Sequence, residues 1–176
     1  MIDFTRNHFE LFGLPARFGV DAAELERAYR ELQRNVHPDR YAGAPDHDRR
    51  LALQASARVN EAYRTLKDPV ARAEYLLQVR GVDATAETDT RLPVDFLTRQ
   101  LERREAADEA REAHDERALA SIVDDVRAEA GEILGGIERV LDADDREAAR
   151  MRVRELRFLA RLGDDLREMQ LAELDR

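Results

Sequence analysis

An imidazole and a carboxylate flank a proline in the tripeptide His37-Pro38-Asp39. Such a pair can bind a metal ion, transfer a proton or make polar contacts with a partner. A metal site would require further ligands, and proton transfer would require a pocket and a third group that orients the imidazole. The other histidines show no ligand spacing: His8, His47 and His114. The sequence therefore predicts no metal, no cofactor and no catalytic residue, and a helical hydrolase built on His37 and Asp39 is the weakest alternative.

A contact surface is the chemistry that remains for the tripeptide. Proline stiffens the chain, so Asp39 can be offered to an arginine or a backbone amide of a partner at small entropic cost. A structural alternative stays open, in which Asp39 only caps a local turn. The choice between them depends on the elements that carry the tripeptide.

The segments on both sides of the tripeptide have the periodicity of amphipathic helices. Asp21 and Glu24 have the spacing of a capping box, and apolar residues follow at helical intervals: Leu25, Ala28, Tyr29, Leu32 and Val36. Pro38 cannot continue this helix, so His37 is about its last residue. After a polar loop at residues 41–48 a second periodic run begins: Leu51, Ala55, Val59, Ala62, Tyr63 and Leu66. We expect a helical hairpin with the tripeptide at its tip.

Shorter elements complete the N-terminal part. Asp68 and Pro69 start a third helical segment, which carries Tyr75, Leu76 and Val79. A brief opening helix at residues 9–12 is expected to pack across the hairpin. Residues 81–92 then lose all periodicity and are predicted to be a linker.

Residues 93–176 predict three further helices. Pro93 suits the first turn of a helix that runs to about His114. The next helix has one long apolar stripe: Leu119, Ile122, Val123, Val126, Ala130, Ile133, Leu134, Ile137, Val140 and Leu141. The last helix carries Leu159, Leu162, Leu166 and Met169. Three glycines of the middle helix suggest close approach of a neighbour: Gly131, Gly135 and Gly136. The predicted fold is all-α, with an N-terminal hairpin domain at 1–80 and a C-terminal three-helix bundle at 93–176.

Composition limits the possible partners. The 176 residues include no cysteine, which excludes disulfides and thiolate metal sites, and 43% are hydrophobic, which is enough for a core. The net charge of −9 opposes binding to nucleic acid phosphates. Residues 1–80 carry 13 basic and 12 acidic side chains, whereas residues 81–176 carry 16 and 26. No apolar run approaches the length that crosses a bilayer, so we expect a cytoplasmic protein with neither nucleic acid nor membrane as a partner.

Two four-residue segments accompany the tripeptide on its helices: Tyr29-Arg30-Glu31-Leu32 and Asn60-Glu61-Ala62-Tyr63. With the tripeptide they make residues 7–80 resemble the J domain, the module that stimulates ATP hydrolysis by DnaK-type chaperones. The resemblance implies that His37, Pro38 and Asp39 contact the chaperone, and that the residues that hydrolyse ATP belong to the chaperone.

The J-domain resemblance also implies that nearby basic side chains meet an acidic chaperone surface: Arg27, Arg30, Arg34 and Arg40. At 100° per residue the first three lie about 140–200° around the helix from Leu25, opposite the apolar stripe. The alternative is that these arginines only solvate the helix and pair with Glu26 and Glu31.

Three more segments extend the resemblance to nearly the whole chain: Phe9-Glu10-Leu11-Phe12-Gly13-Leu14-Pro15, Arg72-Ala73-Glu74-Tyr75-Leu76-Leu77 and Leu156-Arg157-Phe158-Leu159. They resemble the HscB family, J-type co-chaperones of iron–sulfur cluster assembly that bring the scaffold protein IscU to the DnaK-type chaperone HscA. The resemblance implies a scaffold-binding set on the C-terminal bundle: Leu97, Leu101, Glu102, Glu105, Glu109 and Phe158. Thr98 and Ala106 are smaller than the residues expected at their places in that family.

Other interpretations stay open for the C-terminal part. Periodicity alone favours a bundle core that contains Leu97, Leu101 and Phe158, with the glutamates in water. The bundle could also be a dimerising helical hairpin, or a platform in a general J-domain co-chaperone for unfolded clients. The lack of cysteine argues against ligation of a cluster by the chain itself, because thiolates are the main ligands of iron–sulfur clusters. The expected partners are an HscA-like chaperone and an IscU-like scaffold in a bacterial cytoplasm.

Overall fold

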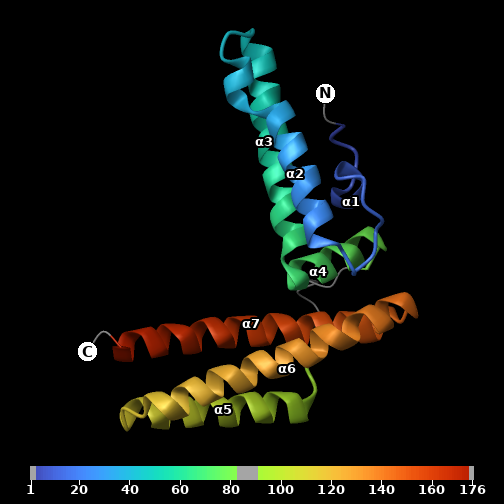
Figure 1. The fold of residues 1–176 in the computed structure, drawn as a ribbon. Helices are drawn as coiled ribbons and strands as arrows, with labels where there is room; N and C mark the ends of the chain where they lie inside the picture. The colour runs from blue at the N-terminus through green and yellow to red at the C-terminus, as the bar shows by residue number, and fades with distance from the viewer. Residues whose placement is uncertain (1–2, 83–90, 175–176) are drawn as a thin grey trace. The chain divides into compact units, whose positions relative to one another are not determined.

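The computed structural model describes residues 3–82 and 91–174, and within these residues all regular structure is helical (Figure 1). The chain divides into two compact units, residues 1–81 and 82–176. The predicted all-α class is confirmed.

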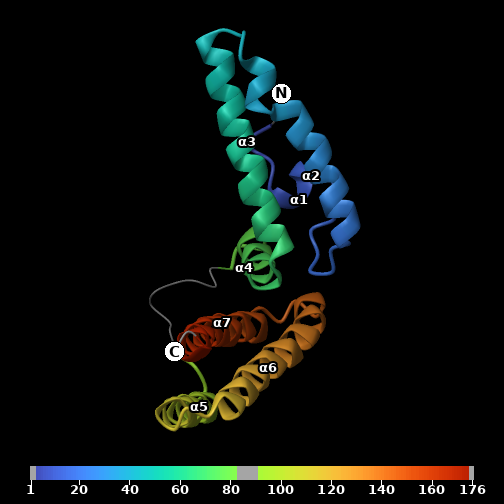
Figure 2. The same ribbon diagram turned by 60° about the vertical axis from the view of Figure 1, so that its left-hand side comes forward.

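The N-terminal unit is built on a long helical hairpin. Its elements are α1 (His8–Leu11), α2 (Ala22–Val36), the 3-10 helix η1 (Pro38–Tyr41), α3 (Asp46–Lys67) and α4 (Pro69–Val79). Helices α2 and α3 run side by side in opposite directions, with η1 near the tip that joins them (Figures 1 and 2). The predicted hairpin is confirmed, and the polar loop is shorter than expected because η1 and an earlier start of α3 take up part of it.

Caps explain where the helices of this unit begin. The Asp21 carboxylate accepts hydrogen bonds from the amides of Ala23 and Glu24 at 2.8 and 3.1 Å, which starts α2. The full capping box lies at α1 instead, where Asn7 and Glu10 each accept from the other's amide. At α4 the Asp68 carboxylate accepts from the amide of Ala71 at 2.7 Å, and Pro69 occupies the first turn.

Helix α1 closes the core of the N-terminal unit. Phe9 is fully buried, together with core residues of α3 and α4: Val59, Ala62, Leu66, Ala73 and Leu76. His8 stacks on the Tyr75 ring at a centroid distance of 4.0 Å, and its amide donates to the Tyr75 hydroxyl at 3.0 Å. The predicted packing of the opening helix on the hairpin is therefore confirmed.

The C-terminal unit is a three-helix bundle of α5 (Val94–Glu112), α6 (Glu116–Asp142) and α7 (Arg146–Leu174). Helices α6 and α7 form its long antiparallel pair, and α5 packs mainly on α6 (Figure 1). The predicted stripes supply the core: Leu119, Val123, Val126, Ile133, Ile137, Leu141, Leu159, Leu162 and Leu166. His114 and Asp144 adopt the left-handed backbone conformation in the two connections, where Asp115 then caps α6.

The three glycines of α6 do not support a close helix contact. A Cβ atom placed at Gly131, Gly135 or Gly136 would meet no atom within 4 Å. The expected close approach is therefore wrong. Gly136 instead borders an open groove, which Phe96 of α5 also lines.

Candidate functional site

The tripeptide forms a capped turn at the end of α2. His37 Nδ1 accepts a hydrogen bond from the amide of Asp39 at 3.3 Å, and Pro38 occupies the first position of η1. The residue that caps the turn is therefore His37, and the alternative that gave this task to Asp39 is wrong. The Asp39 side chain is 89% exposed.

The Asp39 carboxylate is available for a partner. Its Oδ2 lies 3.5 Å from His37 Nδ1, a contact that is an ion pair only when the imidazole is protonated. In the neutral ring the Nδ1 lone pair accepts the Asp39 amide, so that atom has no proton to donate to the carboxylate. His37 thus shapes the turn, and the Asp39 carboxylate faces solvent.

Two side chains of η1 tie the turn back to α2. The Arg40 guanidinium donates to the carbonyl of Arg34 at 3.0 Å, and the Tyr41 hydroxyl donates to the carbonyl of Asn35 at 3.3 Å. Both carbonyls belong to the last turn of α2, where they lack helical partners. Arg40 therefore has a structural contact besides its expected role, and the sequence did not predict the contact of Tyr41.

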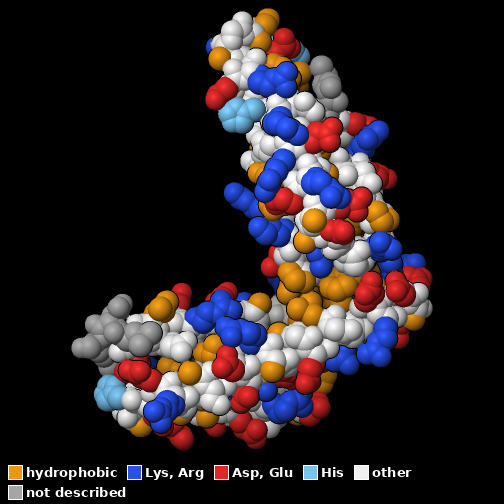
Figure 3. Space-filling model, viewed as in Figure 1, with side chains coloured by type: hydrophobic (Ala, Val, Ile, Leu, Met, Phe, Trp, Pro, Cys, Tyr) orange, Lys and Arg blue, Asp and Glu red, His pale blue; other side chains and the backbone are white. Residues whose placement is uncertain are grey.

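The predicted basic strip on α2 is exposed, but its arginines differ in whether they form an ion pair. Figure 3 shows several Lys and Arg side chains along the hairpin. Arg30 pairs with Glu26 at 2.9 Å, whereas no ion pair involves Arg27 or Arg34 in residues 3–82. The alternative of an internally neutralised face therefore applies to Arg30 alone, and Glu31 takes no part in it.

Aromatic and polar contacts fix α2 against α3. The Tyr29 and Tyr63 rings stack at a centroid distance of 4.0 Å, and the Tyr29 hydroxyl donates to Asn60 Oδ1 at 3.0 Å. The Tyr63 hydroxyl donates to Glu26, which raises the pKa of Tyr63 and lowers the pKa of Glu26. These contacts hold the basic strip in a fixed place relative to the tip.

The C-terminal residues of interest lie on a different kind of surface. Leu97 and Leu101 of α5 are 41% and 60% exposed, although leucine is usually buried. The opposite face of α5 enters the bundle through Phe96, Gln100, Ala107 and Ala110. Glu102, Glu105 and Glu109 are exposed as well. The alternative that placed the two leucines in the bundle core is therefore wrong.

Phe158 lies on α7 and contacts α5 through Phe96. Its ring meets that of Phe96 edge to face, at a centroid distance of 5.6 Å and an interplanar angle of 79°. Phe96 is almost fully buried, and Phe158 is partly buried. Phe158 thus links α7 to the buried face of α5, and for this residue the core interpretation holds in part.

A polar cluster fastens α5 to α6. Gln100, which is 2% exposed, donates to Glu129 at 3.0 Å, and Arg99 and Arg103 also pair with this carboxylate. Burial acts to raise the pKa of Glu129, but the hydrogen bonds from Arg103, Gln100 and Arg99 outweigh it and lower the pKa. Nothing in the helical periodicity predicted this cluster, and its one signal in the sequence is the acidic Glu129 beside the apolar stripe of α6.

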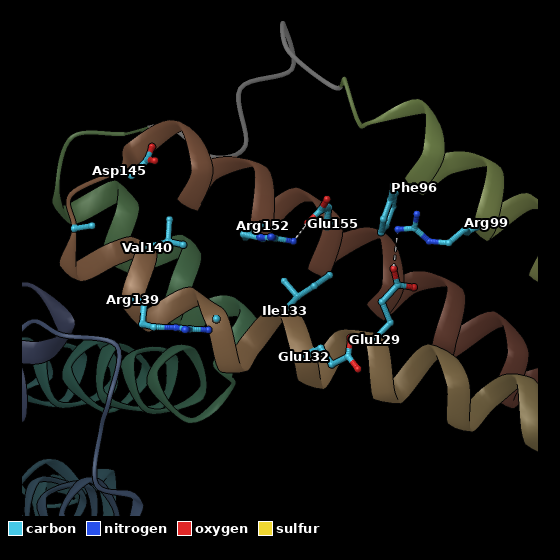
Figure 4. Close-up of a pocket in the computed structure, with 12 residues that line it drawn as sticks. Phe96, Arg99, Glu129, Glu132, Ile133, Arg139, Val140, Asp145, Arg152 and Glu155 are labelled. Atoms are coloured by element: carbon cyan, nitrogen blue, oxygen red, sulfur yellow. Dashed lines mark hydrogen bonds and ion pairs between the residues drawn. The ribbon is translucent and has the colours of Figure 1, made fainter.

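A groove of about 640 Å³ opens within the C-terminal unit beside this cluster (Figure 4). Charged side chains on its wall pair with each other, as Arg152 does with Glu155 at 3.1 Å. No group of three or more metal-binding side chains occurs in residues 3–82 and 91–174. None of the helices there combines the length and the apolar character that crossing a bilayer requires.

Comparison with known families matches both units. Residues 7–75 match the DnaJ domain, and residues 92–167 match the family described as the HSCB C-terminal oligomerisation domain. The "Co-chaperone protein HscB homolog" of Burkholderia multivorans is 43% identical over 166 residues, which cover 94% of this chain and 95% of that protein. The homolog of Cupriavidus taiwanensis is 46% identical over 160 residues, or 91% of each chain.

Solved structures agree with these matches. HscB from Vibrio cholerae superposes with a TM-score of 0.82 at 36% identity, over 93% of this chain and 96% of that one. Human HscB superposes with a TM-score of 0.84 at 30% identity, over 94% and 82%.

The hairpin with its capped tripeptide and the DnaJ match define the class of this protein, a J-domain co-chaperone. The second unit matches the HSCB C-terminal domain, and the relatives align over nearly the whole chain. Together these findings identify one family within that class. The chain belongs to the HscB family.

Proposed function

We propose that this protein brings an IscU-type iron–sulfur scaffold to an HscA-type chaperone in the bacterial cytoplasm and stimulates the ATPase of that chaperone. The chaperone-binding set comprises the tip and the basic residues near it: His37, Pro38, Asp39, Arg27, Arg30, Arg34 and Arg40. The observation that carries this part is the 89% exposed Asp39 carboxylate on a turn that His37, Arg40 and Tyr41 hold in place. A charge fixed before binding loses little entropy when it pairs with an arginine of the chaperone.

The C-terminal unit is proposed to hold the scaffold. The binding set is Leu97, Leu101, Glu102, Glu105, Glu109 and Phe158, of which the first five lie exposed on α5. An apolar centre bordered by charge suits a specific and reversible protein interface. Phe158 supports this face from the α7 side through its contact with Phe96.

One chain carries both the chaperone-binding and the scaffold-binding surface, and this couples delivery of the scaffold to stimulation of the ATPase. Bound scaffold is placed at high effective concentration near the chaperone, so client loading and ATPase stimulation occur together. The protein supplies contacts and the chaperone supplies the chemistry of ATP hydrolysis.

The experiment that tests this function is a steady-state ATPase assay of an HscA-type chaperone. We expect the wild-type protein to raise turnover, and an IscU-type scaffold to raise it further. Unfolded polypeptide in place of the scaffold is the comparison. Equal stimulation by both clients would select the general J-domain alternative, and no stimulation would refute the proposal.

A further inference from the structure

The exposed face of α5 reaches beyond the residues already assigned to it. Val94, Leu97 and Leu101 are spaced at i, i+3 and i+7, so they share one side of the helix. Val94 is 80% exposed, more than either leucine. The apolar stripe therefore begins a full turn before Leu97, at the first residue of α5.

Thr98 adds to this stripe rather than interrupting it. Its hydroxyl donates to the carbonyl of Val94 at 2.9 Å. This bond uses the only hydroxyl proton within the helix, so Thr98 has no donor left for a partner and its methyl group can join the apolar stripe. The apolar surface thus runs from Val94 to Leu101, and Val94 compensates for the small side chain at position 98.

The same side of α5 turns acidic toward its C-terminal end. Glu105, Glu109 and Glu112 follow the stripe at helical spacing and are exposed. No ion pair involves any of them within the described residues. Glu109 and Glu112 stand in the last turn of α5, where negative charge opposes the helix dipole and costs helix stability.

The arginines of α5 do not neutralise these glutamates. All four are engaged elsewhere: Arg99 and Arg103 with Glu129, Arg104 with Asp165, and Arg111 with Asp108. The face is therefore one continuous surface. Its apolar half is exposed to solvent, and the glutamates of its acidic half have no ion-pair partner within the described residues.

We infer that the scaffold-binding face extends along the whole of α5, from Val94 to Glu112, and that the scaffold presents an apolar patch followed by a row of Lys or Arg side chains. The 18 steps between these residues span about 27 Å at 1.5 Å per residue. Val94 and Glu112 are the added specificity residues, one at each end. This inference rests on the proposed scaffold binding and names the chemistry of the partner surface.

Titration calorimetry of the full chain with an IscU-type scaffold tests this extension. Val94→Ser should weaken binding about fivefold at any salt concentration, because it removes apolar contact. Glu112→Gln should weaken binding about twofold at low salt and have no effect near 0.5 M NaCl, where exposed charges are screened. The matched controls are Leu53→Ser, at an apolar position 57% exposed on α3, and Glu138→Gln on α6. Both controls should bind like wild type.

Leu101→Ser in the same assay separates this inference from the proposed function. If that variant loses affinity while Val94→Ser and Glu112→Gln match wild type, the extension is overturned and scaffold binding stands. If wild type itself does not bind the scaffold, both the proposed function and the extension are wrong.

Discussion

The tip of the N-terminal unit and the exposed face of α5 present their side chains in opposite ways. At the tip one carboxylate stands on a short turn that Arg40 and Tyr41 tie back to carbonyls in the last turn of α2. On α5 the side chains stand on a regular helix that is fastened from behind through Glu129. A contact that depends on a single charge requires a backbone that holds this charge in place. A contact that depends on buried apolar surface requires only a helix with one exposed face.

Removal of the apolar side chains at the centre of the α5 face should give the largest loss of affinity for the scaffold. It should leave the function of the tip unchanged. The double variant Leu97→Ser and Leu101→Ser should weaken scaffold binding about 100-fold, since each leucine contributes about 1–2 kcal/mol at an interface centre. Calorimetric affinity is the measurement. ATPase stimulation in the absence of scaffold should stay at the wild-type level, and its loss would mean that the surfaces are not separate.

Acid should destabilise the N-terminal unit through His8. Burial lowers the pKa of His8 from 6.5 to about 4, with Arg58 adding to this effect, and neither ring nitrogen has a hydrogen-bond partner among the described residues. Below pH 6.5 the His8 imidazole is protonated in the unfolded chain but stays neutral in the folded chain until the pH approaches 4. The contribution of His8 to the unfolding free energy is therefore complete above pH 6.5 and is lost as the pH falls toward 4. We expect a loss of about 2 kcal/mol between pH 7 and pH 5.

The control for this prediction is His8→Phe, which keeps the stacking on Tyr75. Hydrogen exchange of amides in residues 8–79 gives the unfolding free energy of this unit alone. The variant should lose much less stability over the same pH range. An equal loss in both proteins would show that His8 is not the cause.

Glu129→Gln should loosen the helix that carries the scaffold-binding face. The substitution removes the charge that binds Arg99 and Arg103, and we expect the C-terminal unit to lose about 1–2 kcal/mol of unfolding free energy. The pKa of Glu129 is lowered in the fold, so its contribution is present above the ordinary pKa and lost as pH falls through the folded value. Denaturant titrations at pH 7 and pH 3 should therefore differ more for wild type than for the variant.

The basic strip should give the smallest effects, and they should be unequal. Arg27→Gln or Arg34→Gln should raise the concentration for half-maximal ATPase stimulation about threefold at low salt. Arg30→Gln should change it less, because Glu26 already pairs with that side chain. Equal effects at all three positions would show that the Glu26 pair does not persist in solution.

Most of the hairpin could be predicted because its causes are local. The helical spacing from Leu25 to Val36 and the missing amide of Pro38 determine where α2 ends, whatever the rest of the chain does. The brace from Tyr41 could not be predicted, because a tyrosine after a turn has many possible acceptors. The cap by His37 depends on a backbone geometry that appears only once η1 forms.

The face of α5 could not be assigned from periodicity for a different reason. Two stripes one position apart compete for the core, one through Phe96 and Gln100 and one through Leu97 and Leu101. The second stripe is more apolar, yet the first is buried. Glu129 makes burial of the first stripe possible, because it accepts hydrogen bonds from Gln100 and Arg103 although it lies far along the chain.

The division of labour between the two surfaces is tested most directly by Asp39→Asn, with both activities measured on the same protein. This variant removes one exposed charge and keeps the size of the side chain. We predict that it binds an IscU-type scaffold with wild-type affinity and no longer raises the turnover of an HscA-type chaperone. Loss of both activities in a folded variant, or full stimulation by it, would contradict the account.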